Sequence, residues 1–374
     1  MQADFGHIDF SEEQAQLLEV AATFARDKSP IDVVRKAMTE EQGFDADIWR
    51  EIVDLGWIAI AIPETLGGVG LSIAEIVPII EQMGKNLMAV PFCEATLASL
   101  ALVSSGTDQQ KDTILPRIVG GEIATVALME SDGKWDLTQP CCEAFSREMR
   151  FDLRGEKCFV GYADVADWVV ISAMLDGRPA LFIANKKDLD GATITRETVI
   201  DETKRSYCID LTGVSLPKSA LLNIDNATMT LKYLRQLGFL FSAAESCGGA
   251  IAVIEYTVDY LKTRKQFGKL IGSYQALKHP IVDAFVEYEK SRSHLYSAAA
   301  RFAEQGVGEI ATSMAKAQAD ATLSFAADRS IQFHGGFGFT YDCDAQLFRR
   351  RAAWHAAVFG DAAYHRKLLA DLIF

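Results

Sequence analysis

A basic corner between two apolar stretches is the segment best suited to binding an anion. It reads RKQFGKLIGSYQALKH over residues 264–279 and places Arg264 beside Gln266, Phe267 and Gly268. An arginine presents a planar fork of donors that matches phosphate oxygens, and a glycine allows a tight turn. A basic turn that simply precedes a helix has the same composition, so this segment alone leaves both interpretations open.

The histidines and cysteines do not have the spacing of a metal site. The six histidines do not cluster, and His355 and His365 are ten residues apart on a helical pattern. The seven cysteines are scattered without a Cys-x-x-Cys pair, apart from the adjacent Cys141 and Cys142. Scattered thiols in odd number are typical of a reduced intracellular protein. We therefore expect no metal site, reduced thiols and a cytoplasmic location.

Composition excludes several classes of protein. The chain has 374 residues, of which 49% are hydrophobic, so it can bury one large core or two to three domains and is too apolar to be disordered. Its formal charge of −14 argues against a nucleic-acid partner, which requires a basic face. The first 30 residues lack a basic segment, and no apolar run reaches about 18 residues without a charge. We expect neither a signal peptide nor a membrane span.

The first third of the chain has helical periodicity. Ser11 and Gln14 have the spacing of a capping box, and Gly56 is placed to end a second helix. A loop with three glycines in four residues, IPETLGGVGLS, separates this helix from the next, and we expect it to form a helix–helix corner. These patterns predict an N-terminal helical domain over residues 1–122.

The pattern then changes to short alternating runs bounded by turn residues. The predicted strands are IATVALME, EMRFDLRG, KCFVG, DWVVISAM, PALFIAN, ATITRET and SYCIDLTGV. They predict a middle β domain, a barrel or sandwich, over residues 123–225.

Helical periodicity returns and continues to the end of the chain. One long helix is expected from about residue 228 to 264, with small residues that permit close helix packing, and two further long helices follow it. These patterns predict a C-terminal four-helix bundle with a short last helix over residues 226–374. The predicted fold class is therefore multidomain α+β in the order helical, β, helical.

This order and four local motifs resemble the acyl-CoA dehydrogenase family. IPETLGGVGLS resembles the family's Pro-Glu-x-x-Gly-Gly-x-Gly loop, and RKQFGKLIGSYQALKH resembles its Arg-x-Gln-Phe-Gly motif with the following Tyr-Gln-Ala. IQFHGGFGFT (331–340) resembles its Gln-x-x-Gly-Gly-x-Gly turn, and RRRAAWHAAVFGD (349–361) resembles its last helix. The four motifs occur in the family's order and cover essentially the whole chain.

The resemblance implies a role for the basic corner. In the family, this corner reaches across a dimer interface and holds the adenosine-diphosphate half of FAD in the neighbouring subunit. The residues that match in this sequence are Arg264, Gln266, Phe267, Tyr274, Gln275, Leu277, Gln332, Gly335 and Gly336. The resemblance therefore implies FAD as the cofactor and an acyl-CoA thioester as the substrate, which the family oxidises at its Cα–Cβ bond.

The sequence departs from the family at the catalytic base. Family members carry a glutamate at one of two positions, which fall here on Phe359 and Gly238. Two other acids lie nearby: Asp361, two residues beyond the first position, and Glu245, two helical turns beyond the second. We interpret Glu245 as structural and keep Asp361 as the weaker candidate for a base.

The middle domain departs as well. The family's Thr-Glu-Pro-x-x-Gly-Ser-Asp segment aligns with LMESDGKWD (128–136), where Glu130 and Ser131 remain but the proline is missing. At the position of a family threonine that touches the flavin, this chain has Gly161, which has no hydroxyl. The half-site for the chain's own flavin is thus degraded, whereas the half-site for a neighbour is intact.

This asymmetry is typical of one subunit of a bacterial α2β2 acyl-CoA dehydrogenase of the sterol side-chain type. The resemblance implies a homologous partner that carries the glutamate, with the present chain completing the partner's FAD site. Two alternatives remain: a self-sufficient homotetramer whose base is Asp361 or Glu245, and a flavin-free structural homologue. Which acyl group is bound does not follow from the sequence.

Overall fold

The computed structural model describes residues 11–306 and 308–374. The first ten residues, which bear on the expectation that there is no signal peptide, lie outside the described residues. The chain forms two units, which we call the helical unit and the mixed unit. The helical unit comprises residues up to Val34, Ile73–Met88 and Phe239–Phe374, and the mixed unit comprises Arg35–Ser72 and Ala89–Gly238.

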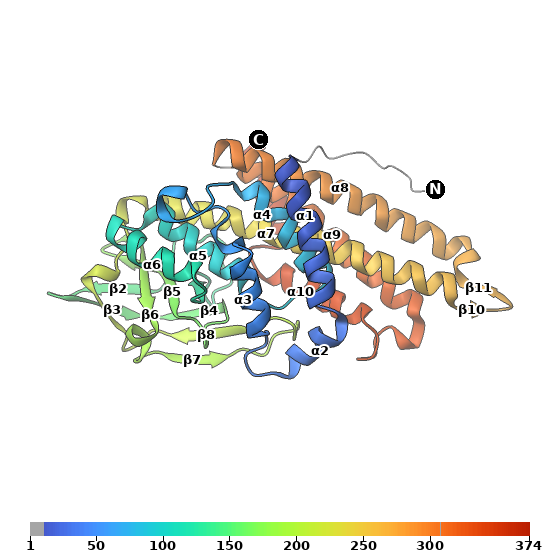
Figure 1. The fold of residues 1–374 in the computed structure, drawn as a ribbon, viewed down its shortest axis with the longest axis horizontal. Helices are drawn as coiled ribbons and strands as arrows, with labels where there is room; N and C mark the ends of the chain where they lie inside the picture. The colour runs from blue at the N-terminus through green and yellow to red at the C-terminus, as the bar shows by residue number, and fades with distance from the viewer. Residues whose placement is uncertain (1–10, 307) are drawn as a thin grey trace. The chain divides into compact units, whose positions relative to one another are not determined.

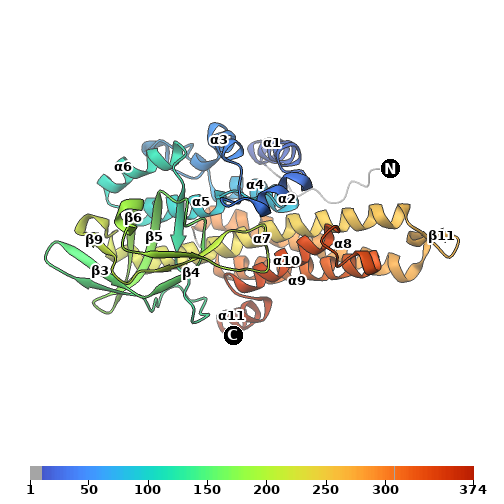
Figure 2. The same cartoon turned by 90° about the horizontal axis from the view of Figure 1, so that it is seen from below.

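The helical unit is built on long antiparallel helices. Its elements are α1 (Glu12–Lys28), the start of α2 (Ile31–Thr39), α4 (Ile73–Lys85), most of α7 (Ile224–Thr263), α8 (Gln275–Gln305), α9 (Glu309–His334), α10 (Ala345–Ala357) and α11 (Ala362–Ile373). Helix α9 packs against α8, α10 and α11, and α4 packs against α1 and α8. A two-stranded hairpin of β10 (Lys265–Gln266) and β11 (Lys269–Leu270) joins α7 to α8 at one end of these helices (Figures 1 and 2).

Small residues let two of these helices approach closely, as expected. A Cβ atom added to Gly248 of α7 would lie 1.9 Å from the backbone oxygen of Glu81 in α4. One added to Gly84 of α4 would lie 2.3 Å from the backbone oxygen of Glu245 in α7. The two backbones therefore touch where each helix has a glycine.

Helix α7 is long and apolar enough to cross a membrane by length and composition alone. However, 89% of its most apolar window is buried inside the protein. The core helix of a folded domain passes the same test, so α7 is weak evidence for a membrane span.

The mixed unit consists of two β-sheets together with α-helices and short 3-10 helices. Its helical elements are α3 (Ala46–Asp54), η1 (Trp57–Ala59), η2 (Glu64–Leu66), α5 (Phe92–Ser105), α6 (Asp108–Val119), η3 (Lys186–Leu189), η4 (Lys218–Ala220) and the first turns of α7. Helix α5 packs against strand β1 and helix α6. Gly56, with φ of +71°, follows α3 as expected for the residue that ends a helix.

The larger sheet has six strands in the order β1-β5-β2-β3-β9, with β6 also paired to β5. These strands are β1 (Ala124–Ala127), β2 (Glu143–Ser146), β3 (Arg150–Arg154), β5 (Trp168–Leu175), β6 (Arg178–Asn185) and β9 (Ser215–Pro217). The smaller, antiparallel sheet has the order β4-β8-β7, from β4 (Glu156–Gly161), β8 (Ser206–Asp210) and β7 (Thr193–Arg196). The apolar faces of these strands form the core of the unit, which includes Phe151, Phe182 and Ile209.

The order of helical, β and helical segments is confirmed, with differences in detail. All seven predicted runs contain strands, but the sequence analysis missed the two-residue strands β10 and β11 and, in the mixed unit, β2 and β9. Strands β2 and β9 are only four and three residues long, and β2 has a mostly exposed pattern. The expected last helix is in fact two helices, because the backbone between α10 and α11 turns at Phe359 (φ +58°) and Gly360 (φ +95°).

Candidate functional site

The basic corner of the helical unit is an exposed hairpin. Arg264 follows α7, Phe267 occupies the tip of the hairpin with φ of +53°, and Gly268 has φ of +76°. Phe267 is 90% exposed, which is unusual for an aromatic side chain that has no partner molecule. The guanidinium of Arg264 makes no hydrogen bond or ion pair with any described residue. This arginine is therefore free to bind an external anion.

The start of α8 supports this hairpin. The hydroxyl of Tyr274 donates a hydrogen bond of 3.3 Å to the backbone oxygen of Gln266, and the backbone N–H of Ile271 donates to the backbone oxygen of Arg264 at 2.9 Å. Tyr274 and Leu277 are half-buried, while Gln275 is exposed. The corner is thus held from its own neighbouring residues, and its outward side chains remain accessible.

The glycines that follow α9 lie at the same end of the helices as the hairpin, and the stacked ring of His334 holds them there. The ring of His334, at the end of α9, stacks on Tyr260 at 4.1 Å and on Tyr256 at 4.8 Å between centroids. Tyr260 lies one helical turn before Arg264, whose backbone N–H donates to the Tyr260 backbone oxygen. Burial of His334 lowers the pKa of its imidazole, which favours the neutral, stacked form.

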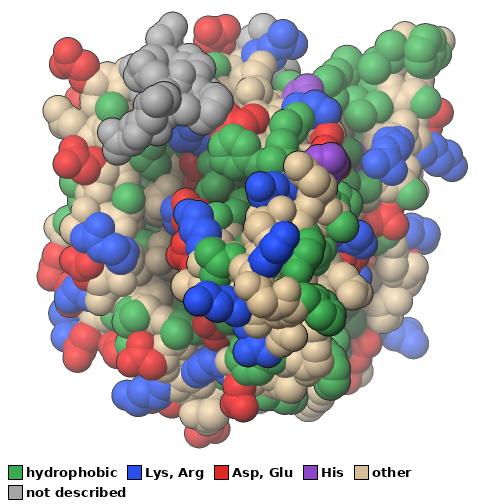
Figure 3. All heavy atoms as spheres, turned by 90° about the vertical axis from the view of Figure 1, so that its right-hand side faces the viewer, with side chains coloured by type: hydrophobic (Ala, Val, Ile, Leu, Met, Phe, Trp, Pro, Cys, Tyr) green, Lys and Arg blue, Asp and Glu red, His purple; other side chains and the backbone are tan. Residues whose placement is uncertain are grey.

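The glycines that follow His334 leave open space above the backbone. Gly335, with φ of +63°, and Gly336 are both exposed, and a Cβ added to either would meet no atom within 4 Å. Gln332 is exposed one turn earlier on α9. Figure 3 looks onto this end, where Lys and Arg side chains gather beside hydrophobic ones. The surface therefore offers cationic, apolar and bare-backbone contacts together.

The first expected base position lies in the turn between α10 and α11. Phe359 is half-buried, and its backbone oxygen accepts a hydrogen bond of 3.0 Å from Nε2 of the buried His365. Asp361 is the N-cap of α11, where its Oδ1 accepts a hydrogen bond of 2.7 Å from the backbone N–H of Tyr364. The carboxylate of Asp361 is thus engaged in ending a turn and starting a helix.

The second position offers no free acid either. Gly238 lies within α7, and the nearby Glu245 is buried. The carboxylate of Glu245 lies 3.7 Å from the guanidinium of the fully buried Arg351 and 3.4 Å from Nε2 of His355. The Glu245 carboxylate thus compensates a buried arginine and is part of the core. Glu245 therefore has the environment of a structural residue.

In the mixed unit, Glu130, which the sequence analysis aligns with an acid of the family, is also paired. Glu130 accepts hydrogen bonds from the backbone N–H groups of Cys141 and Cys142 and from Nζ of Lys157, at 2.6, 2.9 and 2.6 Å. Burial alone would raise the pKa of Glu130, but the charge and hydrogen bonds of Lys157 and the two N–H groups lower it overall. Lys157 is fully buried and also donates to the hydroxyl of Ser172 at 2.9 Å.

At Gly161, where the sequence analysis expects a threonine in the family, the space is filled from α5. A Cβ added to Gly161 would lie 2.6 Å from Oε1 and 2.8 Å from Cγ of Glu94. The backbone oxygen of Gly161 already accepts a hydrogen bond of 2.6 Å from the hydroxyl of Thr125. A hydroxyl-bearing side chain therefore cannot enter here unless Glu94 moves.

The sequence analysis placed the corner residues correctly on a turn but missed what supports them. His334 was not singled out, although it sits inside the quoted IQFHGGFGFT motif. Its stacking on Tyr256 and Tyr260 has a weak signal, the four-residue spacing of two tyrosines on a predicted helix. Lys157 and Glu94 carried no signal, because their partners are distant in sequence.

Comparison with known proteins agrees with the motifs. The family model for the acyl-CoA dehydrogenase N-terminal domain matches residues 11–122, and the model for the C-terminal domain matches residues 230–374. Acyl-CoA dehydrogenase IpdE2 of Mycolicibacterium smegmatis is 30% identical, over 97% of this chain and 100% of its own length.

Two solved structures have the same fold at somewhat lower identity. A variant of the Tcur3481-Tcur3483 steroid ACAD has a TM-score of 0.87 at 28% identity and covers 97% of this chain and 98% of its own. The ChsE4-ChsE5 complex of Mycobacterium tuberculosis has a TM-score of 0.89 at 26% identity and covers 98% of each chain. Together with the two matching domain models, these similarities show that the chain belongs to the acyl-CoA dehydrogenase family of FAD-dependent oxidoreductases.

Proposed function

We propose that this chain is the subunit without a catalytic base in a heteromeric acyl-CoA dehydrogenase. A homologous partner subunit carries the glutamate that removes the α-proton of the acyl-CoA, and this chain completes the partner's FAD site. The observation that carries the proposal is the contrast between the acids near the two base positions and the arginine of the hairpin. The acids near both base positions are engaged in the fold, whereas Arg264 is exposed and has no partner among the residues that the structure describes.

The residues present fit the adenosine-diphosphate half of FAD. Arg264 binds the pyrophosphate through its planar fork of donors, and the exposed ring of Phe267 covers an apolar face of the dinucleotide. Gly335 and Gly336 let the backbone approach the same group, because no side chain stands above them. Gln266, Gln275 and Gln332 supply neutral polar contacts, and Tyr274 and Leu277 line the adenine end.

With the roles divided in this way between the two subunits, FAD would accept the hydride that leaves the β-carbon of the substrate. The present chain orients the cofactor and does not move a proton. Its Phe359, where the family glutamate is expected, cannot accept one, and Asp361 is used as a helix cap. A correctly placed base and acceptor are both necessary for the desaturation, so the chemistry requires the partner.

The names of the relatives support both the partner and the substrate class. One neighbour is a complex of two different chains, ChsE4 and ChsE5, and another is named as a steroid ACAD. We infer an α2β2 assembly that acts on an acyl-CoA with a steroid side chain.

The flavin content of the purified protein tests this proposal. We expect the chain expressed alone to be nearly colourless, and the chain co-expressed with a homologous subunit encoded beside it to contain about one FAD per pair. Activity with steroid side-chain acyl-CoA is then expected only from the pair. A chain that alone binds one FAD and oxidises an acyl-CoA would instead be a self-sufficient homotetramer. A pair without flavin would favour a structural role.

A further inference from the structure

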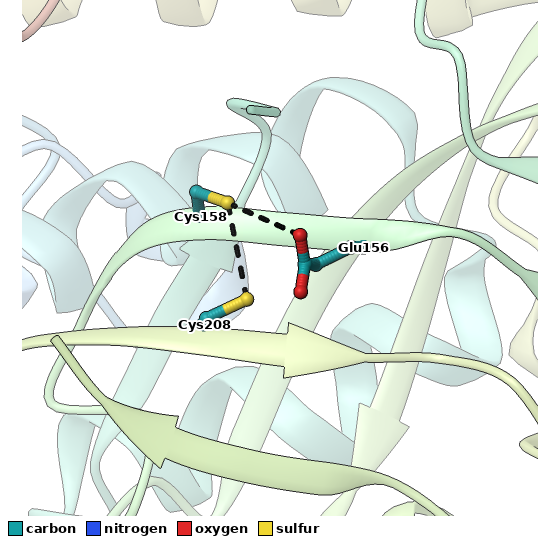
Figure 4. A group of neighbouring side chains, drawn as sticks. All are labelled: Glu156, Cys158 and Cys208. Atoms are coloured by element: carbon teal, nitrogen blue, oxygen red, sulfur yellow. Dashed lines mark hydrogen bonds between the residues drawn. The ribbon is translucent and has the colours of Figure 1, made fainter. Parts of the chain in front are cut away.

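Three potential metal ligands meet on one face of the smaller sheet of the mixed unit. The Sγ atoms of Cys158 in β4 and Cys208 in β8 lie 3.8 Å apart, and Cys158 Sγ lies 3.9 Å from Oε2 of Glu156 (Figure 4). One ligand atom from each of the three residues lies within 4.8 Å of the others. None of these residues belongs to the corner or to the base positions described above.

The strand pairing explains why the three side chains converge. Glu156 and Cys158 are two residues apart in β4, so their side chains emerge on the same face. Strand β8 runs antiparallel to β4, and the register shifts between Lys157 and Val160, where a bulge brings Cys158 opposite Cys208. The bulge includes Phe159, whose φ is +55° and whose backbone N–H donates to Glu197. This convergence is therefore built into the backbone.

The spacing matches a tetrahedral cation better than a disulfide. Two thiolates bound to one Zn²⁺ at about 2.3 Å lie about 3.8 Å apart in tetrahedral geometry, and a thiolate and a carboxylate oxygen lie about 3.6 Å apart. The observed separations of 3.8 and 3.9 Å are close to both values. A disulfide needs its sulfur atoms at about 2.0 Å, so the same pair would have to close by almost 2 Å.

The groups around the two thiols also suit a cation. Oε2 of Glu156 lies 3.9 Å from Sγ of Cys158, and Oε2 of Glu197 accepts a hydrogen bond from the backbone N–H of the adjacent Phe159. Cys158 is only 7% exposed, whereas Glu156 is exposed and Cys208 is half-buried, so an ion would enter from the Glu156 side.

A second cluster in the same unit provides a contrast. Glu130, Asp132 and Cys141 also lie within 4.8 Å of one another. There, however, Lys157 bonds to Glu130 at 2.6 Å and Lys134 to Asp132 at 2.8 Å. Two ammonium groups already neutralise that cluster, which therefore has no need of a metal.

We propose that Glu156, Cys158 and Cys208 form a three-ligand site for a thiophilic divalent cation, with Zn²⁺ as the expected ion and water as its fourth ligand. Binding displaces the two thiol protons to solvent and joins β4 to β8 across the bulge. The site lies next to Phe159 and three residues before Gly161, so the ion would fix the strand that carries the altered flavin segment. This proposal does not depend on the proposed division of work between subunits.

Metal binding by the tag-free full-length chain tests the proposal. The chain is reduced with a phosphine, dialysed against Zn²⁺ and analysed for metal, and a parallel sample is titrated with Co²⁺. We expect about one Zn²⁺ per chain, and with Co²⁺ the near-ultraviolet absorption of thiolate-to-metal charge transfer. Cys158→Ser and Cys208→Ser should each abolish stoichiometric Zn²⁺ binding and weaken that absorption.

Two further variants make the result specific. Glu156→Gln changes an exposed residue, so it should fold normally, bind Zn²⁺ at least about tenfold more weakly and keep the thiolate absorption. Cys141→Ser removes a thiol from the neutralised cluster and should bind Zn²⁺ like the parent. The proposal would be overturned if the parent chain did not bind stoichiometric Zn²⁺. It would also be overturned if the Glu156→Gln and Cys208→Ser variants bound Zn²⁺ as well as the parent does. A Cys158–Cys208 disulfide that forms equally with and without Zn²⁺ would overturn it too and identify a thiol redox pair.

Discussion

The chemistry open to each carboxylate in this chain is decided by the groups that surround it. Glu245 lies against the buried Arg351, and Glu130 lies against the buried Lys157. Removal of either carboxylate would take a charged partner from a buried cation, which typically costs about 3–5 kcal/mol. Asp361 differs, because its hydrogen bond goes to a backbone N–H, and only its charge acts on a buried cation, Lys316. A substitution at Asp361 can therefore separate a structural role from a catalytic one.

Two substitutions, Asp361→Asn and Asp361→Ala, distinguish the structural role of this residue from a catalytic one. Asparagine caps a helix as well as aspartate does but cannot act as a base, whereas alanine does neither. We expect Asp361→Asn to keep the stability and the kcat of the assembled enzyme. We expect Asp361→Ala to keep kcat but to lower the free energy of unfolding by about 1 kcal/mol. Steady-state kinetics and urea unfolding check both; a collapse of kcat in the asparagine variant alone would identify Asp361 as the base.

At the scale of elements, the contact between α4 and α7 depends on glycines whose missing side chains let two backbones touch. Gly248 meets the backbone of Glu81, which cannot move aside without shifting α4. Its neighbour Gly249 faces the side chain of Leu323, where an added Cβ would lie 3.2 Å from a methyl group. The same substitution at these two adjacent positions thus has different physical consequences.

We predict that Gly248→Ala destabilises the protein by about 2 kcal/mol, because overpacking outweighs the gain of about 1 kcal/mol from replacing a glycine within a helix. Gly249→Ala should lie within about 1 kcal/mol of the parent, since the Leu323 side chain can adjust. Chemical unfolding monitored by circular dichroism measures both. Equal stability of the two variants would contradict the close helix contact.

At the scale of the whole molecule, the chain is strongly acidic but presents cations at one corner. The formal charge is −14, yet Arg264, Lys265 and Lys269 are all exposed around the hairpin. Such a local reversal of charge does not stabilise the chain itself, because these side chains lack described acidic partners. These exposed cations are instead suited to attract an anionic group of another molecule.

Replacing Arg264 by alanine should therefore affect the assembly and leave the isolated chain unchanged. We expect Arg264→Ala to unfold like the parent and to lower the affinity of the assembled enzyme for FAD at least tenfold, which corresponds to about 1.4 kcal/mol. Arg301→Ala, an exposed arginine on α8, is the matched control and should retain full flavin occupancy. FAD titration of the flavin-stripped assembly measures the difference, and equal affinity of both variants would exclude a role for Arg264 in binding.

Much of this architecture could be predicted because its signals are local. The capping box of Ser11 and Gln14 and the glycine after α3 are present, and the expected long helix is α7 (Ile224–Thr263), which begins a few residues earlier than its periodicity indicated. The strands of the mixed unit that were missed, β2 and β9, are short. Strand β9 pairs with the distant β3, whereas β2 pairs with its sequence neighbour β3 and with the more distant β5. Their existence depends on tertiary contacts, which a local pattern does not contain.

The same distinction between local signals and tertiary contacts separates the site residues that were predicted from those that were missed. The corner residues were predicted because Arg264 to Leu277 and Gln332 to Gly336 each form a continuous motif. The break at Phe359 was missed because a bulky residue rarely adopts a positive φ. Cys158 and Cys208 are 50 residues apart, so no spacing rule could join them before the strand register was known. The expectation of no metal site followed from that separation.

The contact between Glu94 and Gly161 also constrains the history of this chain. A threonine introduced at position 161 would collide with Glu94 unless that side chain were displaced, because its Cγ atom lies only 2.8 Å from the new Cβ. The two positions are thus coupled, and a larger residue at position 161 is accepted more readily after Glu94 has been replaced by a smaller one. Substitutions at these two positions therefore have a preferred order, because the change at position 94 must come first to make room.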